Sequence, residues 1–344
     1  MSENRTEIAS LGEFGLINRL KTQFLLQQRS SIKGIDDDAA IIAPHPGEQL
    51  VVSTDMLMEG VHFDLSFHPL AHLGYKAVSV NVSDIAAMNA VPTQITVAIG
   101  LSNRFSVEAI DEIYAGIKKA CEDYKIDLVG GDTTSSRAGL AICITAIGQA
   151  PAHKLVCRNT AQKGDIICVS GDLGAAYVGL QILNREKQVF KAAPLAQPKL
   201  EGHSYVLERY LRPEARTDLV HELSEKEVIP TAMIDISDGL SSELLHICKQ
   251  SGLGALLVEE HIPLANQTIE TATNDLNMSA LTCALNGGDD YELLFTIKQS
   301  DYEKLKNHPD IHFIGYMREA EAGVKLALRT GQHVDIKAQG WTHF

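Results

Sequence analysis

Basic residues are scarce in this chain relative to acidic ones. Its 344 residues contain 30 Lys and Arg against 44 Asp and Glu, which leaves a formal net charge of −14 with neutral histidines. A surface of this sign repels the phosphate backbone of nucleic acids. We therefore expect no nucleic-acid partner.

Paired cysteines and long apolar runs are also missing. The six cysteines include no C-x-x-C pair, so the chain has neither the spacing of a structural zinc site nor a disulfide framework. The longest apolar stretch, residues 139–147, is far shorter than the roughly 20 residues of a membrane-spanning helix. These features predict a protein of the reducing cytoplasm with no membrane partner.

Several nucleotide-binding signatures are absent as well. No Gly-Lys dipeptide occurs, which excludes the P-loop, and neither His-Arg-Asp nor Asp-Phe-Gly is present to indicate a protein kinase. Residues 171–174, Gly-Asp-Leu-Gly, have the wrong spacing for a dinucleotide fingerprint. Any nucleotide must therefore be bound by another scaffold.

The pattern of apolar residues predicts an α/β protein. Helical spacing marks residues 11–28, 69–88 and 107–124. Strand-length apolar runs fall at residues 39–43, 50–54, 94–101, 126–129 and 140–147, and a second series falls near 166–169, 232–236, 255–258, 292–297 and 312–314. At about 150 residues per domain the length predicts two domains, which we place at residues 1–150 and 151–344.

Two short motifs recur in the two halves of the chain. Asn81-Val82-Ser83-Asp84 precedes Gly130-Gly131-Asp132, and Asp235-Ile236-Ser237-Asp238 precedes Gly287-Gly288-Asp289 at a similar separation. Because matches of this length arise easily by chance, they support only a hypothesis that the two domains are built alike. Such a repeat would bring both acidic sets to one shared cleft. The glycine pairs suit either close approach of a ligand to the backbone or simple tight turns.

Several aspartates are expected at turns beside apolar strands, where ligands bind in α/β folds. Taken singly, each of them is more commonly a turn former or a helix cap. Four carboxylates in one cleft, those of Asp38, Asp55, Asp84 and Asp132, would repel one another unless cations lay between them. Mg²⁺, which one or two carboxylates share with substrate phosphates, suits such a site, whereas the 13 histidines show no zinc-binding spacing.

Nine motifs, in order along the chain, resemble the thiamine-monophosphate kinase family. They are residues 12–14, 34–39, 53–55, 60–63, 75–77, 81–88, 130–134, 235–240 and 287–293. The resemblance extends from the first helix to Trp341-Thr342-His343-Phe344. This family belongs to the ATP-binding superfamily of aminoimidazole ribonucleotide synthetase and selenophosphate synthetase.

The resemblance implies a fold and a reaction. The fold would be a two-domain, aminoimidazole-ribonucleotide-synthetase-like α/β fold. Its N-terminal domain would bind ATP and several Mg²⁺ ions, and its sheet would form a barrel with that of a second copy in a homodimer. The C-terminal α/β domain would complete the active-site cleft. The reaction would be Mg²⁺-dependent, direct in-line transfer of the γ-phosphoryl group of ATP to thiamine monophosphate, giving thiamine diphosphate and ADP.

The resemblance also implies roles for individual residues. The metal ligands would be Asp38, Ser53, Thr54, Asp55, Asp84, Asp132, Asp235 and Asp238, and among them Asp38, Asp55, Asp84, Asp132 and Asp235 would be catalytic. ATP contacts would fall on Tyr114, Gly131, Asp132, Arg158 and Ser237. Contacts to thiamine monophosphate would fall on His62, Asp289 and Trp341.

Two positions depart from the family pattern. Asp36 replaces a usual glycine beside a proposed metal ligand, and Asp289 replaces a usual glutamate, which shortens a proposed substrate contact by one methylene. The alternatives are another ATP-dependent enzyme of the superfamily, such as a selenophosphate synthetase, or a non-catalytic protein that binds divalent cations. The first would need a reactive residue near the N-terminus, but the first cysteine is Cys121. The second leaves the glycine motifs unexplained.

Overall fold

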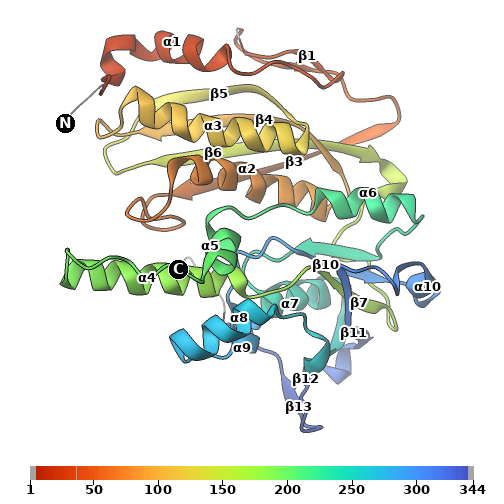
Figure 1. The fold of residues 1–344 in the computed structure, drawn as a ribbon. Coiled ribbons are helices and arrows are strands. Elements are labelled where there is room, and N and C mark those ends of the chain that lie inside the picture. The colour runs from red at the N-terminus through yellow and green to blue at the C-terminus, as the bar shows by residue number, and fades with distance from the viewer. Residues whose placement is uncertain (1–4, 36, 340–344) are drawn as a thin grey trace. The chain divides into compact units, whose positions relative to one another are not determined.

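The computed structural model describes residues 5–35 and 37–339, apart from the side chains of Glu13 and Phe14. The chain forms two compact units (Figure 1). The first comprises Met1–Ile85 and Ala90–His153, and the second comprises Ala86–Asn89 and Lys154–Phe344. In the part of the chain that is described, no helix has both the length and the apolar character needed to cross a membrane.

The first unit contains a four-stranded sheet covered by helices. Its strands are β3 (Glu48–Met58), β4 (Val91–Leu101), β5 (Asp127–Ser135) and β6 (Ala141–Pro151), in the order β3-β6-β4-β5. β6 is antiparallel to β3 and β4, and β4 is parallel to β5. The helices are α1 (Ile8–Lys21), α2 (Leu70–Ala87) and α3 (Val107–Tyr124), and β1 (Ser31–Lys33) with β2 (Ile41–Ile42) forms a separate ribbon.

The two faces of the four-stranded sheet differ in burial. Leu57 on β3 and Ile142 and Ile144 on β6 are buried on the face that the helices cover. On the other face of β3, Leu50, Val52 and Met56 are exposed by 46, 61 and 54%. Because side chains alternate along a strand, β3 presents a row of apolar residues that no described residue of its own unit buries.

The second unit is built on a seven-stranded sheet. Its order is β13-β12-β9-β11-β7-β10-β8, and all neighbours are antiparallel except β12 and β9. The strands are β7 (Ile166–Ser170), β8 (Ala232–Asp235), β9 (Leu253–Val258), β10 (Leu293–Ile297), β11 (Ile311–Glu319), β12 (Val324–Ala327) and β13 (His333–Asp335). The helices are α4 (Ala175–Ala192), α5 (Ser204–Leu211), α6 (Thr217–Glu225), α7 (Leu240–Ser251), α8 (Asn266–Glu270), α9 (Ala280–Asn286) and α10 (Tyr302–Leu305).

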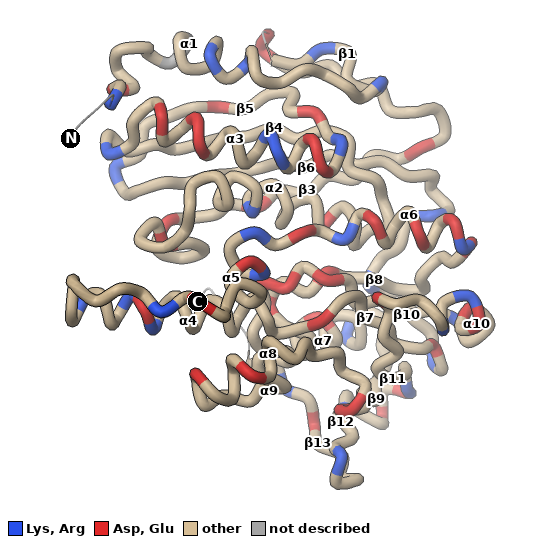
Figure 2. The backbone as a smooth tube through the Cα atoms, viewed as in Figure 1, with Lys and Arg blue, Asp and Glu red and all other residues tan. Residues whose placement is uncertain are grey.

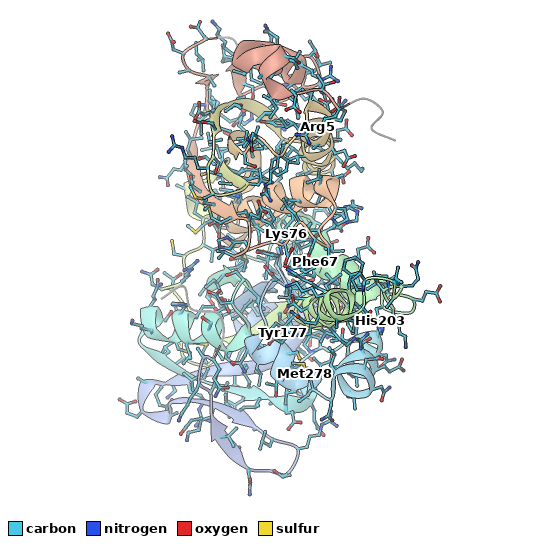
Figure 3. The ribbon with its side chains drawn as sticks, turned by 90° about the vertical axis from the view of Figure 1, so that its left-hand side faces the viewer. Arg5, Phe67, Lys76, Tyr177, His203 and Met278 are labelled. Carbon is cyan, nitrogen blue, oxygen red and sulfur yellow. The ribbon has the colours of Figure 1, made fainter. Side chains whose placement is uncertain are left out.

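Helices cover both faces of this sheet. Ile167 of β7 belongs to the core cluster that contains Leu244 of α7, whereas its neighbour Cys168 belongs to the cluster that contains Leu223 of α6. Burial on both faces explains why the central strands read as continuous apolar runs. A smaller cluster forms among α4, α5 and α9, and Tyr177 and Met278, labelled in Figure 3, pack against it.

Most elements that the apolar pattern predicts are present, but some bounds are wrong. The expected helix at residues 11–28 begins at Ile8 and ends at Lys21, and the small strands β12 and β13 were not predicted. Asp132 was expected at a turn, yet β5 continues through Gly130 and Gly131 to Ser135. A bulge at Val129, just before the glycine pair, shifts the pairing of β5 with β4, and both glycines are then paired with β4.

Candidate active site

Ser53, Asp55 and Asp84 form a group of oxygen donors in the first unit. Ser53 and Asp55 share one face of β3, because side chains two residues apart on a strand point the same way. Asp84 lies on α2, and its Oδ2 accepts a hydrogen bond from Ser53 Oγ. One turn earlier on the same helix, Asn81 Oδ1 accepts the backbone N–H of Asp55 at 2.8 Å. The polar side chains of α2 thus fix both residues of the strand.

The two carboxylates of this group repel one another. Burial, together with the negative charge of Asp84, raises the pKa of Asp55 to about 6. In the described residues, no three His, Cys, Asp or Glu side chains gather into a metal-binding group. Mg²⁺ prefers hard oxygen ligands and combines one or two carboxylates with waters and substrate phosphates. The donor set of Ser53, Asp55 and Asp84 fits such a shared cation.

The other predicted metal ligands of this unit lie apart from this group. The side chain of Thr54 points to the opposite face of β3, where its Oγ1 lies 2.8 Å from Thr145 Oγ1. Asp132 lies on β5, at the far edge of the sheet and three strand spacings, or roughly 14 Å, from β3. Asp38 is exposed between β1 and β2. Of the four carboxylates expected to converge, the structure brings Asp55 and Asp84 together within this unit.

Gly131, Tyr114 and His62 have distinct surroundings. A Cβ added to Gly131 would lie 1.9 Å from the carbonyl oxygen of Val97, so the glycine allows β5 to pair closely with β4. Tyr114 is buried on α3 with its ring edge-on to that of Phe24, and burial raises its pKa to about 12. His62 is half-buried in the turn after β3, where its Nδ1 accepts a backbone N–H at 2.9 Å. A neutral ring then carries its proton on Nε2.

A second acidic group lies in the second unit, at the end of β8. Asp235 is the last residue of the strand and is buried, whereas Ser237 is exposed and Asp238 is half-buried in the turn before α7. The N–H of Asp238 donates to Glu243 Oε1 at 3.1 Å. Glu243 is buried in the first turns of α7, and burial is the largest cause that raises its pKa to about 8. Glu243 thus fixes the backbone of a predicted metal ligand.

The segment Gly287–Tyr291 forms a tight loop against this group. Gly288, Asp289 and Tyr291 have φ values of +73°, +60° and +54°. Residues other than glycine seldom adopt this left-handed conformation. The N–H of Asp289 donates to the carbonyl of Ser237 at 2.8 Å, and Tyr291 Oη donates to Asp289 Oδ1 at 2.9 Å. Asp289 is therefore a direct neighbour of Ser237.

Three residues considered in the sequence remain: Arg158, Asp36 and Trp341. Arg158 is half-buried ahead of β7, and its carbonyl accepts a hydrogen bond from Ser251 Oγ at 3.1 Å. Asp36 and Trp341 lie outside the described residues, so the inferences drawn for them stay predictions.

Known proteins resemble this chain over almost its full length. The thiamine-monophosphate kinase of Aquifex aeolicus is 34% identical over 337 residues, which span 98% of this chain and 99% of that protein. The thiamine-monophosphate kinase of Bacillus subtilis is 32% identical, over 97% of this chain and all of that protein. The chain belongs to the thiamine-monophosphate kinase family. The family model for the AIR synthase related protein, N-terminal domain, matches residues 36–150.

Solved structures agree with membership of the thiamine-monophosphate kinase family. A structure described as AaThiL complexed with AMPPCP and TMP is 32% identical, covers 98% of each chain and has a TM-score of 0.76. A hydrogenase maturation protein, HypE, is 19% identical over 94% of this chain, with a TM-score of 0.74. At that identity the second likeness shows the fold alone, which is the aminoimidazole-ribonucleotide-synthetase-like fold expected from the motifs.

Asn81 and Glu243 contact predicted site residues, but the sequence alone did not mark either of them as part of the site. Asn81 lies within a recognised motif, but its bond to the Asp55 backbone depends on how α2 lies against β3. Glu243 is the acidic residue of the first turn of α7, where a carboxylate is ordinarily interpreted as a favourable helix-end charge. Its burial was the missing signal.

Proposed function

We propose that this chain transfers the γ-phosphoryl group of ATP to thiamine monophosphate, giving thiamine diphosphate and ADP. The observation that carries the proposal is the full-length relationship to thiamine-monophosphate kinases at 32–34% identity. A relative of similar identity has been solved with AMPPCP, an ATP analogue, and TMP. The pair of carboxylates beside Ser53 supports it independently, because phosphoryl transfer requires cations that neutralise phosphate charge.

The acceptor phosphate needs little activation. The second pKa of a phosphate monoester is about 6, so near neutral pH its oxygen is already largely anionic. Catalysis then consists mainly of charge neutralisation and alignment of the two phosphates. Ser53, Asp55 and Asp84 of the first unit would hold Mg²⁺, as would Asp235 and Asp238 of the second. When bound, Mg²⁺ stabilises the charge that develops on the transferred group.

The roles of the other residues complete the proposal. His62, Asp289 and Trp341 contact thiamine monophosphate, and the Nε2–H that the turn assigns to His62 suits donation to a phosphate oxygen. Gly131, Asp132, Arg158 and Ser237 contact ATP. Tyr114 is assigned to the same ligand, although its side chain is buried and its ring lies against that of Phe24. Asp38 and Thr54 complete the proposed metal ligands, although the side chain of Thr54 points to the face of β3 opposite Ser53 and Asp55.

We further propose that the transfer is direct, without a phosphoenzyme. An anionic acceptor gains little from a covalent relay, and no cysteine or histidine stands in a recognised nucleophile motif. With a chiral γ-phosphoryl group, a single in-line displacement inverts the configuration at phosphorus. Retention would indicate two successive transfers and would overturn this part of the proposal.

The exposed face of β3 supports the proposal that the chain forms a homodimer. Leu50, Val52 and Met56 present an apolar row that the same row of a second copy would bury. Val52→Lys is expected to shift the chain from dimer to monomer when its mass is measured in solution by light scattering. A wild-type chain that stays monomeric at micromolar concentration contradicts the pairing.

Turnover of ATP that depends on thiamine monophosphate tests the proposed function. The purified chain is assayed for ADP with Mg²⁺ and ATP alone, and then with thiamine monophosphate, thiamine or selenide. We expect ADP formation with thiamine monophosphate only. Selenide-dependent turnover would support a selenophosphate synthetase, and Mg²⁺ binding without turnover would support a cation-binding protein.

A further inference from the structure

A buried ion network underlies the loop that carries Asp289. The side chain of Glu292, only 3% exposed, receives Arg209 Nη2 at 3.0 Å and Arg216 Nη1 at 2.8 Å. Ser170 Oγ, at the end of β7, donates to the same carboxylate at 2.5 Å. Charged residues of both signs gather around α5 and the neighbouring end of α6 (Figure 2). The network fastens the C-terminal end of the loop to three elements outside it.

The two arginines have different partners. Arg209, on α5, also places Nη2 at 3.1 Å from the carbonyl oxygen of Asp172 and at 3.4 Å from that of Asp290. Arg216 directs its remaining nitrogens to the carboxylates of Asp218 and Asp310, which belong to neither loop. Arg209 therefore bridges the loop after β7 and the loop that carries Asp289, whereas Arg216 ties Glu292 to surrounding structure.

A second link joins the same two loops. Both carboxylate oxygens of Asp290 accept the N–H of Gly174, at 3.0 and 2.9 Å. The anchors at Asp290 and Glu292 flank Tyr291 and directly follow Asp289, and both of these residues have the left-handed conformation. A strained conformation of this kind persists only where its surroundings determine it strongly. The buried contacts of Asp290 and Glu292, which directly follow Asp289 in the chain, supply that determination.

We propose that Arg209 is a positioning residue that holds Asp289 in place for the acceptor substrate. This inference rests on the proposed function, in which Asp289 contacts thiamine monophosphate. Arginine suits the role because its Nη2 lies within hydrogen-bond distance of acceptors on both loops, whereas the shorter side chain of lysine keeps the attraction to Glu292 but does not place its nitrogen at the same point. Loss of the bridge releases the loop and weakens acceptor binding, while Glu292 and the rest of the sheet remain.

Steady-state kinetics of Arg209→Lys and Arg209→Met measure this effect. We expect the KM for thiamine monophosphate to rise several-fold in the lysine variant and by about tenfold or more in the methionine variant. The KM for ATP and kcat should change by less than about twofold. Arg19→Lys is the matched control, because Arg19 makes a bidentate contact with Asp111 in the first unit and should leave all three constants unchanged.

A double-mutant cycle separates positioning from general destabilisation. If Arg209 acts through Asp289, Arg209→Lys should add little to the KM change already caused by Asp289→Asn. A purely structural effect would raise the KM by the same factor in either background. Additive effects, or an unchanged KM for thiamine monophosphate in both Arg209 variants, would overturn the proposal.

Hydrogen exchange tests the loop itself, independently of turnover. The amides of Asp289 and Tyr291 donate to the carbonyls of Ser237 and Ile236, so both should exchange faster in Arg209→Lys than in the wild-type chain. Unchanged exchange in an otherwise folded variant overturns the positioning role. If the wild-type chain lacks turnover, the proposed function fails, and the exchange rates still decide whether Arg209 positions the loop.

Discussion

The two units hold their acidic residues in different ways. In the first unit Ser53, Asp55 and Asp84 project from a regular strand and a regular helix, and hydrogen bonds between those elements fix them. In the second unit Asp238 and Asp289 lie on turns, which backbone hydrogen bonds and buried charges hold. In helices and strands the regular spacing of residues determines where a side chain points. In turns, additional buried contacts must hold the backbone that carries the side chain.

The short motifs that recur along the chain lie in different local structures. Asn81-Val82-Ser83-Asp84 lies inside α2, but Asp235-Ile236-Ser237-Asp238 leaves the end of β8 for a turn. Gly130-Gly131-Asp132 lies within β5, but Gly287-Gly288-Asp289 leaves the end of α9, and its last two residues have the left-handed conformation. At these motifs the hypothesis that the two domains are built alike is wrong. Four similar letters do not determine a conformation when the flanking apolar pattern differs.

Removal of a carboxylate from the first unit should have the largest effect. We expect Asp55→Asn or Asp84→Asn to lower kcat/KM at least about a hundredfold, because each takes away a charged ligand worth several kcal/mol in the transition state. The thermal midpoint of the metal-free variants should not fall, since each substitution removes repulsion between the two carboxylates. Asp111→Asn, at the surface pair with Arg19, is the control and should cost less than twofold. Near-normal turnover of both variants at saturating Mg²⁺ would contradict the assignment.

Substitution of the two glycines of β5 should affect stability unequally. Gly131→Ala places a Cβ 1.9 Å from a backbone oxygen of β4, and such overpacking costs about 1–3 kcal/mol. Gly130→Ala meets nothing nearer than a methyl group of Thr96 at 3.8 Å and should change the free energy of unfolding by less than about 1 kcal/mol. Urea denaturation of the two variants gives the comparison. Equal losses would show that strand pairing does not require the glycine at residue 131.

Asp290, in the second unit, should give a smaller effect that depends on pH. Burial raises the pKa of this carboxyl to about 7, although Arg209 and the Gly174 N–H act to lower it. An acid whose pKa is higher in the folded chain than in the unfolded one, near 3.9, destabilises the fold as the pH rises from about 4 to about 7. In Asp290→Asn this loss is absent, so the melting temperature of the variant relative to wild type should rise across that window. A constant difference would show that Asp290 is ionised at no net cost.

The sequence predicted the elements of the first unit better than the geometry of the second. The helix at Val107–Tyr124 has the predicted bounds, and strand alternation places Ser53 and Asp55 on one face, because both follow from side-chain periodicity. The buried pairing of Arg209 and Arg216 with Glu292 joins residues up to 83 positions apart, and nothing in the local pattern marks them as partners. The left-handed conformation of Tyr291 is likewise one that local propensity does not predict.

The fate of the γ-phosphoryl group tests the central claim most directly. The chain is incubated with Mg²⁺, thiamine monophosphate and ATP labelled in its γ-phosphoryl group, and the products are separated. We predict that the label appears in the terminal phosphoryl group of thiamine diphosphate, in an amount equal to the ADP formed. Label found only in inorganic phosphate, with no labelled thiamine diphosphate, would contradict the assignment of this chain as a kinase of thiamine monophosphate.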